Sequence, residues 1–111
     1  MSERWILFVD DKKTPSDFVR KYAVLSEPSC RIVHCTTAEH ALLVLRNSSD
    51  KPLALFIDGY LGIGMHGVEF LEEAHREHAS LLQGVEIQPI SGDFETEMLL
   101  RRTIQRLFPK D

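Results

Sequence analysis

Apolar and polar residues follow one another along the chain in blocks. Short runs in which almost every residue is apolar, such as WILFV at 5–9 and LALFI at 53–57, are typical of strands that are buried on both faces of a sheet. Between these runs, apolar residues recur every three or four positions, which is typical of amphipathic helices. The pattern predicts four strands, at residues 4–10, 31–36, 53–58 and 84–91.

A helix is expected after each strand, because local start signals follow each apolar run. Thr14, with Pro15 and Asp17 behind it, resembles a capped helix start and predicts a helix that extends to about Leu25. Comparable signals predict three more helices: one that begins at Thr36 or Thr37 with Glu39 completing a capping box, one over about 68–79, and one that Asp93 caps.

The resulting order, in which strands and helices alternate four times, predicts an α/β fold with a parallel sheet between two layers of helices. Pro89 lies inside the fourth predicted strand and has no N–H to donate. Proline in a strand is found mainly at the rim of a sheet, so the fourth strand is expected at an edge. The whole chain, residues 1–111, is expected to form a single domain.

Composition narrows the class of protein further. The chain is 43% hydrophobic and 27% charged, and its net charge of −4 argues against a general nucleic-acid-binding surface. We find neither a signal peptide nor an apolar run of membrane-spanning length. Cys30 and Cys35 are expected to be reduced thiols of a cytoplasmic protein.

Acidic residues stand where two of the predicted strands end. Asp10 and Asp11 lie at the end of the first strand, Asp58 ends the third, and Ser91 ends the fourth. Ligands of open parallel sheets bind at this end of the strands, and three carboxylates that meet there favour a hard cation such as Mg²⁺. The alternative is that each acid only starts a turn or caps a helix.

With these residues in place, the sequence resembles a known family, the receiver domains of two-component response regulators, whose fold is flavodoxin-like. The resemblance extends over nearly the whole chain. It predicts the same three-layer fold, here with four strands and without the fifth strand and helix of a full receiver. Four motifs carry it: ILFVDDKK at 6–13, ALFIDGYLG at 54–62, GMHGVEFL at 64–71 and PISGDFETE at 89–97.

The resemblance assigns a role to each residue of this group. It implies that Asp58 is the phosphoacceptor and that the Ser91 hydroxyl binds the phosphoryl group. It also implies a Mg²⁺ site formed by Asp10, Asp11, Asp58 and the backbone carbonyl of Tyr60. The expected partners are proteins, either a sensor kinase or an output domain, with no membrane involved and with nucleic acid expected only for the alternative function described below.

The chain departs from the receiver pattern at two places. Gly62 stands where receivers have a proline after the phosphoacceptor. The lysine that follows the fifth strand of receivers has no clear counterpart, and Lys110 lies close to the end of the chain without a hydrophobic run before it. Because that positive charge steadies the transferred group, phosphorylation is expected to be weak or absent.

A second resemblance leaves an alternative function open. The cyclic-phosphate-processing receiver-like domains share the acidic pair and a similar third strand, and they imply a metal-dependent phosphoesterase. Their pattern has a histidine and an acid where this chain has Gly59 and Tyr60, and another histidine where it has Gln88. Whether the protein is an enzyme therefore stays open at the level of sequence.

Overall fold

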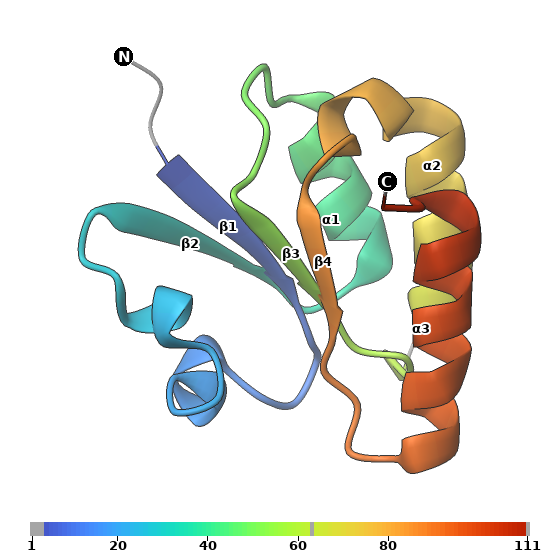
Figure 1. The fold of residues 1–111 in the computed structure, drawn as a ribbon, viewed down its shortest axis with the longest axis horizontal. Helices are drawn as coiled ribbons and strands as arrows, with labels where there is room; N and C mark the ends of the chain where they lie inside the picture. Colours follow the sequence, from blue (N-terminus) through green and yellow to red (C-terminus); the bar gives the residue numbers. More distant parts are fainter. Residues whose placement is uncertain (1–3, 63, 111) are drawn as a thin grey trace.

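Four parallel strands form the centre of the molecule. The computed structural model describes residues 4–62 and 64–110. The strands lie in the order β2-β1-β3-β4, so β1 and β3 are neighbours, and the prediction of a four-stranded parallel sheet is confirmed (Figure 1). Their bounds are Arg4–Val9 for β1, Cys30–Cys35 for β2, Ala54–Ile57 for β3 and Glu86–Pro89 for β4.

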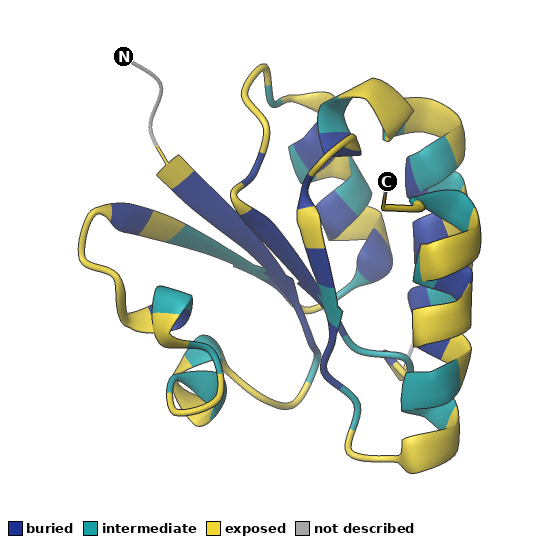
Figure 2. Ribbon diagram, in the orientation of Figure 1, coloured by how far each residue is buried: buried dark blue, intermediate teal, exposed yellow. Residues whose placement is uncertain are grey.

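The two central strands are buried on both faces, as their continuous apolar runs predict. Every residue of β3, and every residue of β1 except Arg4, is buried (Figure 2). Burial of large side chains such as Phe8 and Phe56, each 1% exposed or less, is the main source of stability in such a sheet.

Three α-helices cover one face of this sheet (Figure 1). They are α1 (Ala38–Arg46), α2 (Gly67–Leu82) and α3 (Phe94–Leu107). Each buries an apolar stripe against the strands, with Leu45, Phe70 and Leu100 each 1% exposed or less. No helix in the described part of the chain combines the length and the apolar character that crossing a membrane requires.

The other face carries no α-helix in the described residues, and the predicted helix from Thr14 to about Leu25 is wrong. The segment forms two short 3₁₀-helices, η1 (Pro15–Phe18) and η2 (Ala23–Ser26). Tyr22 between them is extended, with φ −128° and ψ 92°, which interrupts the helical path.

Aromatic packing explains why this segment is not a continuous helix. The Phe18 ring lies 5.8 Å from that of Phe8, and the Tyr22 ring lies 4.9 Å from that of Phe56. A helix of about twelve residues is marginal in water, so contacts of this kind override its local start signals. Pro28 then holds Glu27 in an extended conformation and ends the segment.

The strand β4 lies at the edge of the sheet, as Pro89 predicts. Pro89 is paired with Ile57 of β3, and the N–H of the next residue, Ile90, donates to the Ile57 carbonyl (3.0 Å). By the alternation of a parallel ladder, the nitrogen of Pro89 faces the open side, where no N–H is needed. No fifth strand lies beside β4 in the parts of the chain described.

Candidate metal centre

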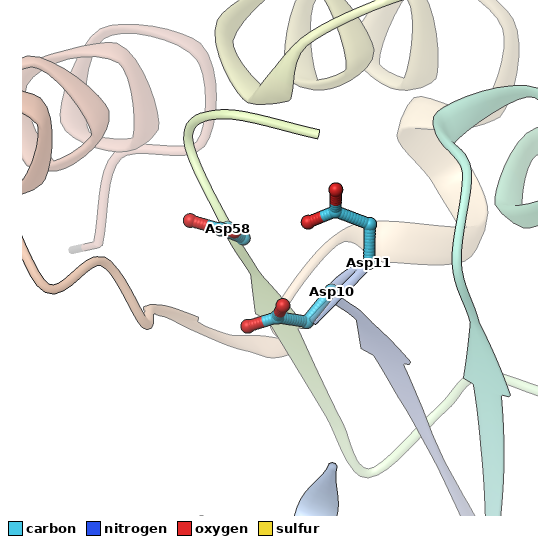
Figure 3. A group of neighbouring side chains, drawn as sticks. All are labelled: Asp10, Asp11 and Asp58. Atoms are coloured by element: carbon cyan, nitrogen blue, oxygen red, sulfur yellow. The ribbon is translucent and has the colours of Figure 1, made fainter. Parts of the chain in front are cut away.

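Three carboxylates meet at the carboxyl ends of β1 and β3 (Figure 3). One oxygen each of Asp10, Asp11 and Asp58 lies within 4.8 Å of the others. They meet because β1 and β3 are adjacent and parallel, so residues that follow the two strands emerge at one edge of the sheet. Asp10 is 2% exposed, whereas Asp11 and Asp58 are partly exposed.

Asp10 is held in place by hydrogen bonds on both sides. Its Oδ1 accepts from the backbone N–H groups of Lys12 (2.9 Å) and Lys13 (3.0 Å). Its own N–H donates to the Cys35 carbonyl (3.1 Å), and a ring nitrogen of His34 lies 2.9 Å from its carbonyl oxygen. These bonds satisfy a buried carboxylate and fix the turn that follows β1.

Asp58 is positioned by a close approach of backbone segments. Its N–H donates to the Val9 carbonyl (3.0 Å), and the N–H of Gly67 donates to the Gly59 carbonyl (3.0 Å). A β-carbon at Gly67 would lie 2.4 Å from the Asp58 carbonyl oxygen, closer than real contacts allow. Glycine at 67 therefore lets the start of α2 pack directly against the residue after β3.

The electrostatics of the cluster favour a bound cation. The pKa of Asp58 is raised to about 6, mainly by burial and also by the neighbouring charges of Asp10 and Asp11, while hydrogen bonds from the backbone N–H groups of Tyr60 and Gly59 act in the opposite direction. Asp11 Oδ1 is buried without a hydrogen-bond partner. Carboxylates that repel one another, with one oxygen unsatisfied, fit a hard divalent ion such as Mg²⁺.

The loop between β3 and α2 is fastened to the rest of the molecule by two side chains. Glu39 Oε2 accepts from the Met65 N–H (3.0 Å), and His66 Nδ1 accepts from the Leu61 N–H (3.2 Å). The His66 ring also stacks on that of Tyr60, with centroids 4.6 Å apart. The loop that contains the Tyr60 carbonyl is thus braced next to Asp58.

The expected capping role of Glu39 is wrong. Thr37 caps α1 by accepting from the His40 N–H (3.1 Å), as one of the two predicted possibilities. Glu39 points instead to the loop, where it lies within 3.0 Å of the position that a β-carbon on Gly64 would take. No sequence signal links Glu39 to a loop 26 residues away.

Ser91 follows β4, on the far side of β3 from Asp10. Its hydroxyl is engaged with Asp93, because Ser91 Oγ accepts from the Asp93 N–H (3.1 Å) and lies 3.3 Å from the Asp93 carbonyl oxygen. The structure thus places Ser91 at the expected end of the sheet with its side chain in a local turn.

Lys110 lies at the opposite end of the sheet. Its ammonium group forms an ion pair with Glu86 (2.6 Å), which is the first residue of β4. The three carboxylates lie where the strands end, so Lys110 does not supply a positive charge to them. Lys13 follows the acidic pair in the sequence, and its ammonium nitrogen lies 4.0 Å from the position that a β-carbon on Gly92 would take.

Comparisons with known structures identify the architecture. A structure of NtrX from Brucella abortus superposes with a TM-score of 0.67 at 27% identity, over 92% of this chain and 22% of that one. A CheY-like response regulator receiver domain protein from Methanospirillum hungatei gives 0.64 at 22% identity, over 92% and 76%. A response regulator receiver protein from Pseudomonas putida gives 0.67 at 18%, over 96% and 81%. The fold is that of a receiver domain.

The comparisons that support the receiver fold are structural. No protein-family model matches the sequence, and comparison with curated proteins gives no match. The chain spans about a fifth of the length of the NtrX structure and most of the length of the two receiver proteins. The similarity therefore establishes the receiver architecture. It does not establish a chemical activity for Asp58.

Proposed function

We propose that this protein is a receiver-like signalling module in which Asp58 accepts a phosphoryl group. One observation carries the proposal: the Asp58 carboxylate lies at the end of β3 within 4.8 Å of two further carboxylates, Asp10 and Asp11. Three acids at this position cost stability in the absence of a cation. The unsatisfied oxygen of Asp11 and the receiver fold support the same interpretation.

The chemistry follows from the arrangement. A carboxylate oxygen of Asp58 attacks the phosphorus of a phosphoryl donor, the bond from phosphorus to the donor oxygen breaks, and the donor leaves with the electron pair. Asp10, Asp11, Asp58 and the Tyr60 carbonyl would hold Mg²⁺, which neutralises charge on the phosphoryl oxygens when bound. Asp10 keeps its orientation through the backbone of Lys12 and Lys13, independently of the reaction.

The partners that this role requires are proteins of a signalling pathway. A sensor kinase would supply the phosphoryl group, and an output domain would respond to it. Such a pathway operates in the cytoplasm, which agrees with the two buried free cysteines, Cys30 and Cys35. Gly59, the residue after Asp58, lies directly against Thr96 of α3, and this contact supports α3 as the element that responds.

Labelling with a small phosphoryl donor tests the proposal. The protein is incubated with acetyl phosphate and Mg²⁺, and the intact mass is measured. We expect one added phosphoryl group per chain, none in Asp58→Asn, and unchanged labelling in Asp50→Asn, an exposed acid that lies before β3 at the other end of the sheet.

The same samples distinguish the proposed phosphoacceptor from a binding module and from a phosphoesterase. A chain that gains no phosphoryl mass and binds no beryllofluoride with Mg²⁺ would be a binding module without phosphorylation. Turnover of a cyclic phosphate without a covalent adduct would instead indicate the phosphoesterase. Gly59 and Gln88, at the positions where that family has histidine, favour the receiver.

A further inference from the structure

The side chain of Lys13 extends from the turn after β1 toward the loop after β4. Its backbone belongs to the turn after β1, where its N–H donates to Asp10 Oδ1 (3.0 Å). Its ammonium nitrogen lies 4.0 Å from the position that a β-carbon on Gly92 would take, in the loop after β4. Because β3 lies between β1 and β4, this side chain passes the end of the strand that Asp58 follows.

The ammonium group of Lys13 is held loosely. It lies 5.7 Å from the centre of the Phe18 ring, a cation–π contact that leaves its three N–H donors available. No carboxylate of residues 4–62 or 64–110 lies within 4.0 Å of it. Lys13 is also exposed, so a group that binds at the end of β3 can reach it.

Gly92 contributes the space that the lysine uses. Among the described residues, apart from its chain neighbours, a β-carbon there would meet only the Lys13 ammonium nitrogen, at an ordinary contact distance of 4.0 Å. Gly92 is the residue after Ser91, the expected hydroxyl ligand of a phosphoryl group. The Lys13 ammonium thus lies next to the loop after β4 that contains both Ser91 and Gly92.

We infer that Lys13 is the cation that binds the phosphoryl group on Asp58. This inference rests on the proposed function and deepens it, because it names the residue that completes the site. It assigns the positive charge to the turn after β1, within the chain segment that also holds Asp10 and Asp11, while Lys110 is committed to Glu86 at the other end of β4.

The role of Lys13 in the transfer is electrostatic. As the bond between phosphorus and the donor oxygen breaks and the bond to Asp58 forms, negative charge rests on the three other phosphoryl oxygens. The Lys13 ammonium donates a hydrogen bond to one of them and keeps its proton throughout. The sequence-based expectation of weak or absent labelling assumes that no such cation is present, and Lys13 removes that assumption.

Three variants, compared with one another, test the inference. Lys13→Gln removes the charge, Lys13→Arg retains it, and Lys51→Gln makes the same change of net charge at an exposed lysine that lies before β3, at the other end of the sheet. For each we measure the rate of labelling by acetyl phosphate, the affinity for beryllofluoride in the presence of Mg²⁺, and the affinity for Mg²⁺ alone.

We expect Lys13→Gln to be labelled about tenfold more slowly or worse, and to bind beryllofluoride correspondingly less tightly, because a charge-assisted hydrogen bond is lost. Its affinity for Mg²⁺ alone should be unchanged or higher, since a positive charge near the carboxylates is removed. Lys51→Gln should be labelled at the wild-type rate, and Lys13→Arg should retain most of that rate.

Three other results would each contradict a specific proposal. Equal labelling and beryllofluoride affinity in wild-type protein and Lys13→Gln would overturn the role of Lys13 and leave the phosphoacceptor intact. A drop in the Mg²⁺ affinity of Lys13→Gln would show that Lys13 only supports the turn at Asp10. A wild-type protein that neither accepts the phosphoryl group nor binds beryllofluoride would overturn both proposals.

Discussion

Gly59 lies so close to Thr96 that a β-carbon on Gly59 would come within 2.0 Å of Thr96 Cγ2. Gly59 directly follows Asp58, and Thr96 lies in the first turn of α3, where its N–H is bound by the Asp93 carboxylate (3.0 Å). The loop that carries the proposed phosphoacceptor and the last helix of the structure therefore touch without an intervening side chain.

Gly59→Ala should destabilise the protein through this contact. The φ angle of Gly59 is not positive, so alanine fits the backbone and the effect is steric. We expect a loss of about 1–3 kcal/mol in the free energy of unfolding, the range for overpacking a close contact. Urea denaturation measures it.

Thr96→Ser provides the matched test, because it removes Cγ2 and keeps the hydroxyl that bonds Asp93 (2.6 Å). In the double variant, most of the stability lost by Gly59→Ala should return. If the double variant is as unstable as the sum of the two single variants, the two residues are not in direct contact.

The raised pKa of Asp58 predicts how stability depends on pH. A carboxyl group whose pKa rises from 3.8 when unfolded to about 6 when folded stabilises the fold at low pH, and this contribution is lost as the pH rises through 6. In metal-free protein at neutral pH, Asp58→Asn should therefore increase the free energy of unfolding by about 1–2 kcal/mol.

Most of that gain should disappear at about pH 4, where Asp58 is protonated in the folded protein and partly protonated in the unfolded chain. Urea denaturation in EDTA at both pH values gives the comparison. A gain that is equal at the two pH values would mean that the charge of Asp58 is not its cause.

Magnesium should stabilise the folded protein. A ligand that binds only the native state adds about 2.7 kcal/mol at a concentration about a hundredfold above its Kd, because it shifts the equilibrium by mass action. Asp10→Asn combined with Asp11→Asn should abolish the increase in Tm, and Asp50→Asn should retain it. A wild-type Tm that does not respond to millimolar magnesium would contradict the metal site.

Lys110→Met should change little. The ion pair between Lys110 and Glu86 is exposed, with both side chains close to half exposed or more, and such pairs contribute about 0–1 kcal/mol. Labelling of Asp58 by acetyl phosphate should match wild type, since Lys110 lies at the far end of β4. Loss of labelling in this variant would show that the C-terminal segment reaches the carboxylates.

Much of the fold follows from the sequence because its strongest patterns are local. The continuous apolar runs mark strands that are buried on both faces, and Pro89 marks the edge strand correctly. The meeting of Asp10, Asp11 and Asp58 also follows, because parallel strands end at one side of a sheet and β1 and β3 are neighbours.

The errors arise where contacts distant in sequence override local signals. Start signals at Thr14 predict a helix, but ring contacts of Phe18 and Tyr22 with the sheet favour two short turns. Glu39 matches a capping box and instead holds the Met65 backbone. The sequence does not distinguish Lys13 from an ordinary solvated lysine, because its proximity to Gly92 is seen only in the structure.

The two faces of the sheet are covered unequally, and the covering of the face without α-helices is expected to unfold locally more readily. The face beneath α1, α2 and α3 is sealed by helices with continuous hydrogen-bond ladders, whereas residues 15–26 are held by isolated bonds such as Lys21 N–H to the Phe18 carbonyl (3.1 Å). Few bonds need to break for this segment to open. Its amide protons should exchange with deuterated solvent well before those of the sheet.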